Sequence, residues 1–279
     1  FHQDAVRQMR LEEEVRQAEE HGRQRDMQTE SMSDITKINV EEIAHSGAAY
    51  QGVRIPGKGI GMVATRDIKY GELLLEERPL VKQSFQSQLM SRIRGKDGDL
   101  RSQFDCLSIA DQNRVMNLHD ATSEAKTLQG IFCTNCLGQG AKSTDTVLCF
   151  ETSFFNHSCR PNVDHTWADP FKRTYAVRDI KKGEELCISY LGDVSFQPRA
   201  NRRKALEKYD FDCSCEICSL TGNELVRIEK ALAKYQRLDD QIMSVGCYDQ
   251  RRGLQMVDEA LALIKKDFFP NGMPTQTHR

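Results

Sequence analysis

Three cysteines within six residues constrain the fold of this chain more than any other feature of its sequence. Cys213, Cys215 and Cys218 form the spacing Cys-x-Cys-x-x-Cys. Cysteines this close seldom bridge one another, but their thiolates can share one zinc ion, which takes four ligands in a tetrahedral site. Cys159 is the candidate for the fourth ligand, and the alternative of three free thiols is disfavoured by so tight a spacing. We expect a closed, structural site that fastens the segment around Cys159 to the chain beyond residue 209.

The chain has ten cysteines, and they allow two interpretations. They could form disulfides in a secreted protein, or they could be reduced thiols with a metal site in an intracellular one. Cys149 and Cys187 lie inside apolar stretches, where a small buried thiol is an ordinary core residue. We therefore expect a reducing compartment, the nucleus or the cytoplasm, with one zinc ion per chain and six ordinary thiols.

Charge and hydropathy disfavour further classes of protein. The chain has 39 Lys and Arg against 41 Asp and Glu, whereas general nucleic-acid binders carry a basic excess or a basic stripe. No apolar run approaches the roughly 20 residues that span a bilayer. No basic flank followed by an apolar stretch marks a secretory signal near the first residue. We expect a soluble protein with no nucleic acid and no membrane among its direct partners.

The order of the expected elements predicts an α+β fold. Helical patterns occupy both ends of the chain and one central stretch, at 4–30, 87–130, 223–245 and 254–268. Short strand patterns separated by turn residues occur at 50–55, 61–65, 72–78, 146–150, 162–167, 173–178 and 185–190. The last two helices carry apolar stripes, so we expect them to pair over the β core.

Three further segments could carry chemistry, although each has a plain structural alternative. Asn156 and His157 open the segment Asn-His-Ser-Cys-Arg-Pro-Asn, which could equally be a turn between strands. The glycine-rich segment 57–61 lets the backbone approach a ligand closely, but it lacks the ending of a phosphate-binding loop and could be a hairpin turn. The predicted strand over 183–190 ends in Tyr190, which could simply lie in the core or at a sheet edge.

Taken in this order, the segments closely resemble the SET domain of protein-lysine methyltransferases. The glycine-rich segment and residues 63–68 are similar to the opening of that domain, and the segment 156–162 is similar to its central motif. The strand over 183–190 is similar to its second motif. The cysteine spacing at 213–218 is similar to the post-SET zinc segment. The resemblance runs from about residue 48 to residue 220.

Within that family the chain most resembles the SMYD branch and its fungal relatives that lack a MYND finger. The run over 202–213 and the insert motif over 131–135 carry this likeness. SMYD proteins hold a MYND zinc finger in the insert, but residues 82–150 here offer only Cys106, Cys133, Cys136 and Cys149. These lack the spacing for two zinc sites, so we interpret them as non-metal thiols and expect no peptide-binding MYND finger.

The resemblance also implies a division of the chain. We expect a SET domain of small sheets over 48–192, with a helical insert over about 82–146. A post-SET zinc segment would follow over 193–220. An N-terminal helical extension over 1–47 and a C-terminal helical region over 221–279 would flank these parts.

The resemblance implies S-adenosylmethionine as the methyl donor and a lysine side chain as the acceptor. The residues that match cofactor-binding positions are Lys58, Gly59, Ile60, Asn135, Asn156, His157 and Phe211. The loop at 58–60 would hold the methionine end through its backbone, and Asn156 would bind the amino group or the carboxylate. His157 would lie near the adenine, on which Phe211 would stack.

Tyr190 matches the catalytic tyrosine of the family, and its hydroxyl would orient the amine near the transferring methyl. A phenol with an ordinary pKa near 10 is a poor base at neutral pH, so we do not expect Tyr190 to act as one. The implied substrate is a lysine-containing protein or peptide, histone tails included. The alternative is a catalytically silent SET-like module that binds a peptide or a partner protein.

Overall fold

The computed structural model describes residues 40, 43–44, 47–94, 98–123, 125–140, 143–245 and 248–268. The expected N-terminal helix over 4–30 lies outside the described residues. In the part of the chain that the structure describes, no helix is both long enough and apolar enough to cross a membrane.

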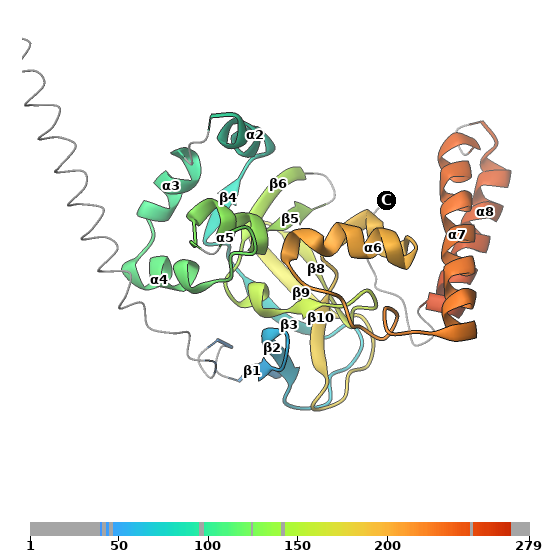
Figure 1. Ribbon diagram of the computed structural model, residues 1–279, viewed down its shortest axis with the longest axis horizontal. Coiled ribbons are helices and arrows are strands. Elements are labelled where there is room, and N and C mark those ends of the chain that lie inside the picture. The colour runs from blue at the N-terminus through green and yellow to red at the C-terminus, as the bar shows by residue number, and fades with distance from the viewer. Residues whose placement is uncertain are drawn as a thin grey trace, which may run out of the picture. The chain divides into compact units, whose positions relative to one another are not determined.

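The first sheet brings together strands from the beginning and the end of the β region. Its order is β1-β2-β10-β7, formed by Tyr50–Ile55, Gly59–Ala64, Glu185–Ile188 and Asn156–His157. β1 and β2 form the antiparallel hairpin visible in Figure 1, and the turn between them places Gly57 and Gly59 at φ 74° and 76°, a conformation that favours glycine. β7 pairs in parallel with β10, which places Asn156 opposite Cys187.

Two three-stranded antiparallel sheets complete the β region. One has the order β3-β9-β8, formed by Leu73–Glu77, Phe171–Ala176 and Val163–Ala168. The other has the order β4-β6-β5, formed by Val81–Gln83, Ser143–Leu148 and Leu137–Gly140. The strand patterns predicted from the sequence are confirmed in place, but the short strands β4, β5 and β7 were missed.

The helical stretch expected over 87–130 consists of four short helices. They are α2, α3, α4 and α5, over Phe85–Arg94, Gly98–Asp105, Ile109–Asn117 and Leu128–Asn135. Ser108 caps α4 by accepting a hydrogen bond from the Asp111 N–H, and Thr127 caps α5 by accepting one from the Gly130 N–H. α3 packs against β4 and α5, so these helices cover the third sheet (Figure 1).

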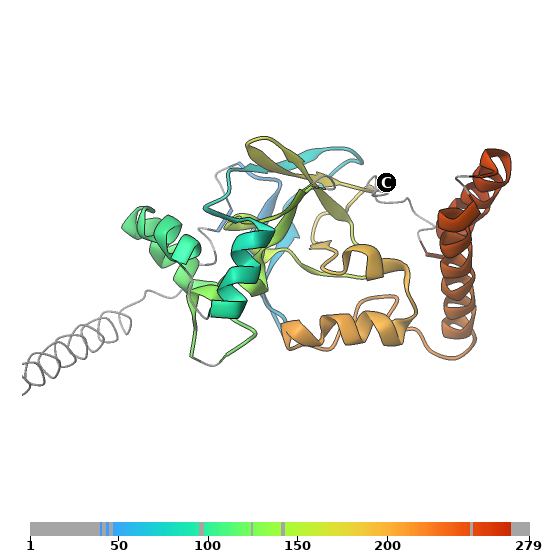
Figure 2. The same ribbon diagram turned by 90° about the horizontal axis from the view of Figure 1, so that it is seen from above.

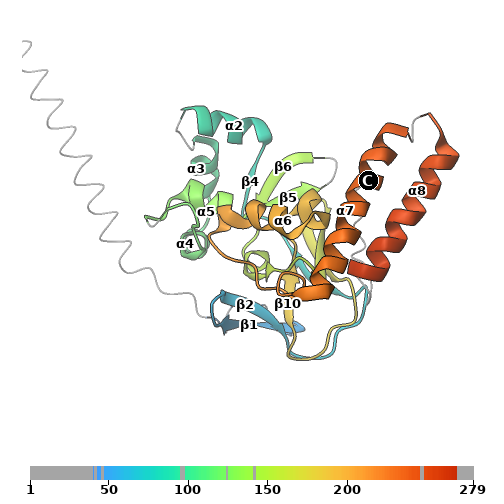
Figure 3. The same ribbon diagram turned by 45° about the vertical axis from the view of Figure 1, so that its right-hand side comes forward.

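The C-terminal part is helical, as the sequence predicted. Its elements are α6, α7 and α8, over Arg199–Leu206, Gly222–Val245 and Gln250–Leu263, followed by a π-helical turn, η5, over Ile264–Phe268. α7 and α8 run side by side (Figures 2 and 3). We expected them to pair over the β core, but Ile228 and Leu232 of α7 instead pack in the buried cluster around the cysteines.

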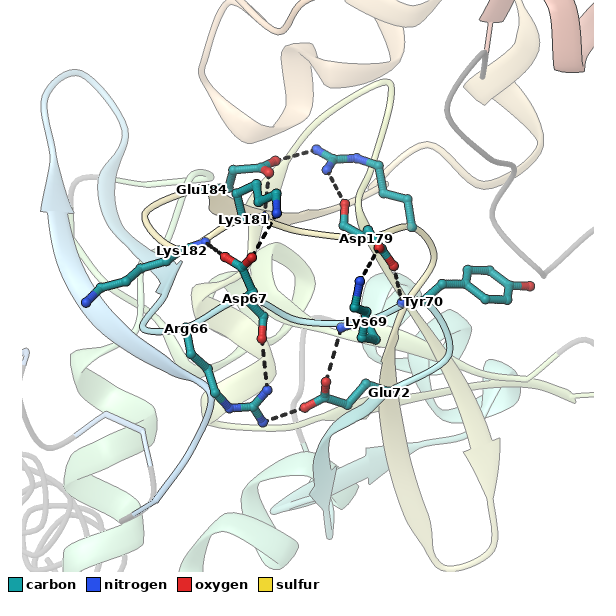
Figure 4. A network of polar contacts seen from close by, with 10 residues as sticks. Arg66, Asp67, Lys69, Tyr70, Glu72, Asp179, Lys181, Lys182 and Glu184 are labelled. Carbon is teal, nitrogen blue, oxygen red and sulfur yellow. Dashed lines mark hydrogen bonds and ion pairs between the residues drawn. The ribbon is translucent and has the colours of Figure 1, made fainter.

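A polar network joins the turn at residues 66–72 to the turn at residues 179–184, at the edge of the β region (Figure 4). Ile68 and Ile180 exchange two backbone hydrogen bonds of 2.9 Å and are both 1% exposed. Around them lie solvent-exposed ion pairs, Lys69 with Asp179 and Lys181 with Asp67, each at 2.8 Å. Exposed pairs of this kind contribute little to stability, because water and salt screen the charges. The two buried backbone hydrogen bonds between Ile68 and Ile180 are therefore the main contact that holds the turns together.

A buried lysine links the second and third sheets. Lys172 of β9 is 1% exposed, and its Nζ donates a hydrogen bond of 2.5 Å to the backbone carbonyl of Gly138 in β5. Burial lowers the pKa of Lys172 to about 8, because a charged amine loses its hydration in the interior. The nearby Cys149 and Asp164 oppose this shift only in part.

The Lys172→Met variant should reveal this buried charge through pH dependence. The unfolded chain keeps the lysine proton up to its ordinary pKa near 10.5, whereas the native state loses it near 8. Between these values the unfolded state binds more protons, so wild-type stability gains up to about 1.4 kcal/mol per pH unit relative to Lys172→Met. Denaturant unfolding at pH 7 to 10 measures this, with the exposed Lys182→Met as control. Parallel curves for wild type and Lys172→Met would contradict it.

Candidate functional site

The four cysteines predicted to hold zinc lie together. Cys159 follows β7, whereas Cys213, Cys215 and Cys218 follow η4 (Glu207–Tyr209). Their sulfur atoms all lie within 4.8 Å of one another, with Cys159 Sγ 4.0 Å from that of Cys213 and 3.5 Å from that of Cys218. A tetrahedral zinc with Zn–S bonds of about 2.3 Å places its sulfurs about 3.8 Å apart. The donor set and its spacing therefore fit one closed zinc site.

The electrostatic surroundings favour the thiolate, the form that binds metal, at two of the four cysteines. The hydrogen bond from Cys159 lowers the pKa of Cys218 to about 7 and that of Cys215 still further. The hydrogen bonds with Cys213, Cys215 and Cys218 raise the pKa of Cys159 above its usual range. For Cys213, the contact with Cys159 lowers the pKa, but contacts with Cys215 and Cys218 outweigh it, so the pKa of Cys213 is also raised. Arg202 of α6 is fully buried, and its Nη2 donates to Cys218 Sγ across 3.7 Å. Four thiolates around Zn²⁺ carry a net charge of about −2. The buried guanidinium offsets part of that charge.

His157 connects the cysteine cluster to Tyr190. Its Nδ1 accepts a hydrogen bond of 3.1 Å from the backbone N–H of Tyr190, and its Nε2 lies 3.4 Å from Cys159 Sγ. Burial lowers the pKa of His157 to about 4, so the ring is neutral at pH 7. A neutral ring that accepts at Nδ1 carries its proton on Nε2. His157 therefore donates to the sulfur and holds the start of the Tyr190 segment at the same time.

Aromatic rings gather beside this histidine. The Tyr190 ring centroid lies 5.3 Å from that of His157, 5.0 Å from that of Tyr209 and 6.4 Å from that of Phe211. Asp210, between the last two, has a left-handed backbone with φ 57°. Phe211 remains 37% exposed, so part of its ring is open to a ligand. The sequence predicted Tyr190, His157 and Phe211 as site residues, and the structure places them together.

The Tyr190 hydroxyl is a donor in this arrangement. It donates a hydrogen bond of 2.8 Å to the backbone carbonyl of Phe155. Burial raises the pKa of Tyr190 above its ordinary value, because the phenolate would lose hydration, so the hydroxyl keeps its proton at neutral pH. This agrees with the expectation that Tyr190 does not act as a simple base.

A second, polar group lies across β2, β10 and β7. Glu185 Oε2 pairs with Lys58 Nζ at 2.6 Å, and Glu185 Oε1 accepts from Asn156 Nδ2 at 2.9 Å. Lys58 and Asn156 were predicted from the sequence, but Glu185 was missed. The segment 183–190 contains two adjacent glutamates, Glu184 and Glu185. Only the sheet order β2-β10-β7 shows that Glu185 is the one between Lys58 and Asn156.

The remaining candidate residues lie in two places. Gly59 and Ile60 open β2 directly after Lys58, next to the polar group. Asn135 ends α5 in the insert, where its amide nitrogen donates to the carbonyls of His119 and Ile131 at 2.7 Å each. These contacts tie Asn135 to the insert rather than to the other candidate residues, and its cofactor role remains a prediction.

Comparison with known protein families matches the part of the chain that carries most of these candidate residues. Residues 59–191 match the family model described as SET domain. That span begins at the glycine turn and ends immediately after Tyr190. It contains the polar group around Glu185, apart from Lys58, and the first of the four cysteines.

Three relatives illustrate the range of similarity. The histone-lysine N-methyltransferase set5 of Schizosaccharomyces pombe is 29% identical, over 73% of this chain and 61% of the relative. A putative SET domain-containing protein, L678, of Acanthamoeba polyphaga mimivirus is 27% identical, over 60% of this chain and 76% of the relative. The human histone-lysine N-methyltransferase SMYD3 is 36% identical, over 31% of this chain and 22% of its own length. The predicted likeness to SMYD-like proteins is confirmed.

The cysteine cluster makes a direct prediction about metal content. The purified chain should contain one zinc per molecule, and Cys215→Ser should lose it, because three thiolates leave the tetrahedral site one ligand short. The variant should also unfold at lower denaturant concentration, since binding energy at a structural zinc site is folding energy. Elemental analysis and unfolding curves measure both effects, with Cys106→Ser as the control. Metal-free wild type, or two zinc ions per chain, would contradict the assignment.

Proposed function

We propose that this chain, which carries a SET domain, is a protein-lysine methyltransferase that uses S-adenosylmethionine. The observation that carries the proposal is the convergence of His157, Tyr190 and Phe211 beside the cysteine cluster. These three side chains come from segments up to 54 positions apart in sequence. A fold that served only as a peptide platform would have no need to gather them.

The residues present fit the cofactor. The open part of the Phe211 ring offers a surface on which the adenine would stack, and aromatic stacking adds about 1 kcal/mol to such a contact. The polar group around Asn156 would take the methionine end. When bound, the cofactor supplies a methyl group on a positively charged sulfur, so the chain itself need supply neither a metal nor a covalent intermediate at the reaction centre.

Tyr190 and its surroundings would orient the reacting groups. Methyl transfer needs the amine, the methyl and the sulfur in line, with water excluded. The Tyr190 hydroxyl is fixed by its hydrogen bond to the Phe155 carbonyl, so its oxygen has a defined position from which to align an incoming amine. Because this hydroxyl keeps its proton, the lysine would lose its own proton to another acceptor, such as water, before it reacts.

We assign zinc a structural role at this site. The four thiolates leave no open coordination position for substrate. Through Cys159 and His157 the cluster fixes the backbone of Tyr190, and through Cys213 it fixes the segment that carries Phe211. Zinc would therefore act by holding the cofactor-binding residues in place.

The substrate we propose is a lysine-containing protein or peptide, with histones as the first candidates because two of the relatives are histone-lysine methyltransferases by name. The chain spans 61% of the length of the S. pombe relative, so the substrates of that whole protein are not simply transferred to it. Cysteines that must stay reduced to bind zinc are consistent with the nucleus or the cytoplasm. Label transfer from S-adenosylmethionine to purified histones and to cell extract would identify the substrate class.

The Tyr190→Phe variant tests the proposal. Removing one oriented hydroxyl at the reaction centre should lower turnover about 100-fold or more while cofactor affinity stays within a factor of about 2. Methylation assays and calorimetric titration with S-adenosylmethionine measure the two quantities, with the exposed Tyr70→Phe as control.

Full activity of Tyr190→Phe would remove Tyr190 from the mechanism. A wild-type chain that binds peptides but no S-adenosylmethionine would instead support the alternative, a silent SET-like binding module.

A further inference from the structure

The carbonyl that accepts the Tyr190 hydroxyl belongs to a short, buried segment of the chain. Phe155, which carries this carbonyl, is fully buried and directly follows η2, a single helical turn over Glu151–Phe154. The Phe155 N–H donates a hydrogen bond of 3.2 Å to the Thr152 carbonyl inside that turn. Because this bond fastens Phe155 to η2, any contact that fixes η2 also fixes the acceptor of the Tyr190 hydroxyl.

Glu77 of β3 supplies the cap that η2 lacks locally. The residue before the turn is Phe150, whose side chain makes no capping hydrogen bond. The Glu77 carboxylate acts instead, from 74 positions away, and accepts from the Glu151 N–H at 2.9 Å with one oxygen. Its other oxygen accepts from the Thr152 N–H at 3.1 Å and from the Thr152 hydroxyl at 2.8 Å. Thr152 is buried, so these donors would be left unpaired without the carboxylate.

Tyr50 of β1 touches both ends of the same turn. Its hydroxyl donates a hydrogen bond of 2.7 Å to Glu151 Oε2, at the start of η2. Its ring centroid lies 5.6 Å from that of Phe155, just past the end of η2, in an edge-to-face arrangement. Burial raises the pKa of Tyr50 above its ordinary value, so the hydroxyl keeps its proton and remains a donor. A rigid side chain therefore spans the turn from its first residue to Phe155.

The two residues that follow Phe155 are held by a different element. Asn156 and His157 form β7, which pairs with β10, and the Asn156 amide also donates to Glu185. A change at η2 should therefore move the Phe155 carbonyl more than it moves these two candidate cofactor-binding side chains.

We propose that Glu77 and Tyr50 are positioning residues, which hold η2 and, through the Phe155 carbonyl, set the place of the Tyr190 hydroxyl. This inference rests on the proposed function, in which that hydroxyl aligns the incoming amine. Methyl transfer needs its reacting groups in line, and a misplacement of about 1 Å can lower a rate 100-fold. Loosening η2 therefore lowers turnover without removing any group from the reaction centre.

A double-mutant cycle tests the coupling to Tyr190. Glu77→Gln leaves one acceptor oxygen in place of two, so it should lower kcat about tenfold while the affinity for S-adenosylmethionine stays within a factor of about 2. In the Tyr190→Phe background the same change should lower kcat less than about twofold, because the hydroxyl that Glu77 positions is already absent. Glu76→Gln is the matched control and should keep the wild-type kcat, since Glu76 pairs at the surface with Arg173 at 2.5 Å.

Hydroxyl exchange measured by NMR tests the same coupling without a reaction. In a chain with ¹³C at Cζ of its tyrosines, the deuterium isotope shift reports how fast each hydroxyl exchanges with solvent. The signal that disappears in Tyr190→Phe identifies Tyr190. Glu77→Gln and Tyr50→Phe should each speed the exchange of the Tyr190 hydroxyl about tenfold, because they loosen its acceptor. Glu76→Gln and the exposed Tyr70→Phe should leave that exchange unchanged.

The outcomes separate this inference from the proposed function. An equal loss of kcat when Glu77→Gln is added to wild type and to Tyr190→Phe would show a merely structural role and overturn the inference. Unchanged hydroxyl exchange in both Glu77→Gln and Tyr50→Phe would also overturn it. If the wild type transfers no methyl group, the proposed function is wrong, and the exchange measurement alone decides whether Glu77 and Tyr50 hold the hydroxyl. If Glu77→Gln does not fold, Tyr50→Phe replaces it in the cycle, with Tyr70→Phe as control.

Discussion

The meeting of four cysteine sulfurs from two distant segments is the contact on which the rest of the site depends. Cys159 lies more than 50 positions before its three partners, and the sulfurs lie within 4.8 Å of one another. A zinc ion bound at this point would add folding energy to that of the apolar cluster that surrounds the cysteines. It would hold the turn after β7 and the segment after η4 in one place, together with the candidate cofactor residues that they carry.

Other parts of the chain are arranged around the same junction. Arg202 places a buried cation beside the thiolates, and Ile228, Leu232 and Phe268 surround the cysteines with apolar side chains. Arg160, next to Cys159, donates to the Phe268 carbonyl and pairs with Glu216 at 2.5 Å. The C-terminal helices are thereby joined to the segment that carries Cys213, Cys215 and Cys218.

The sequence predicted the parts of this arrangement that have a local signal. Cysteine spacing identified three of the four clustered cysteines, and strand patterns identified β1, β2 and β10. The two-residue strand β7 forms only because β10 lies beside it, a pairing with no local pattern. Glu185 was missed for the same reason, since its contact Lys58 is 127 positions away. The sequence predicted helical structure over 87–130 without its internal boundaries, because the caps at Ser108 and Thr127 are single polar residues within a helical periodicity.

The structural role proposed for zinc is tested most directly by measuring the affinity of the chain for S-adenosylmethionine with and without the metal. Calorimetric titration of the zinc-loaded chain with S-adenosylmethionine should show binding. After zinc is removed with a chelator under reducing conditions, binding should be lost, and it should return when zinc is added back. The loss is expected because Phe211, His157 and Tyr190 are held through Cys213 and Cys159. Equal affinity of the zinc-loaded and zinc-free protein would contradict this role of the cluster.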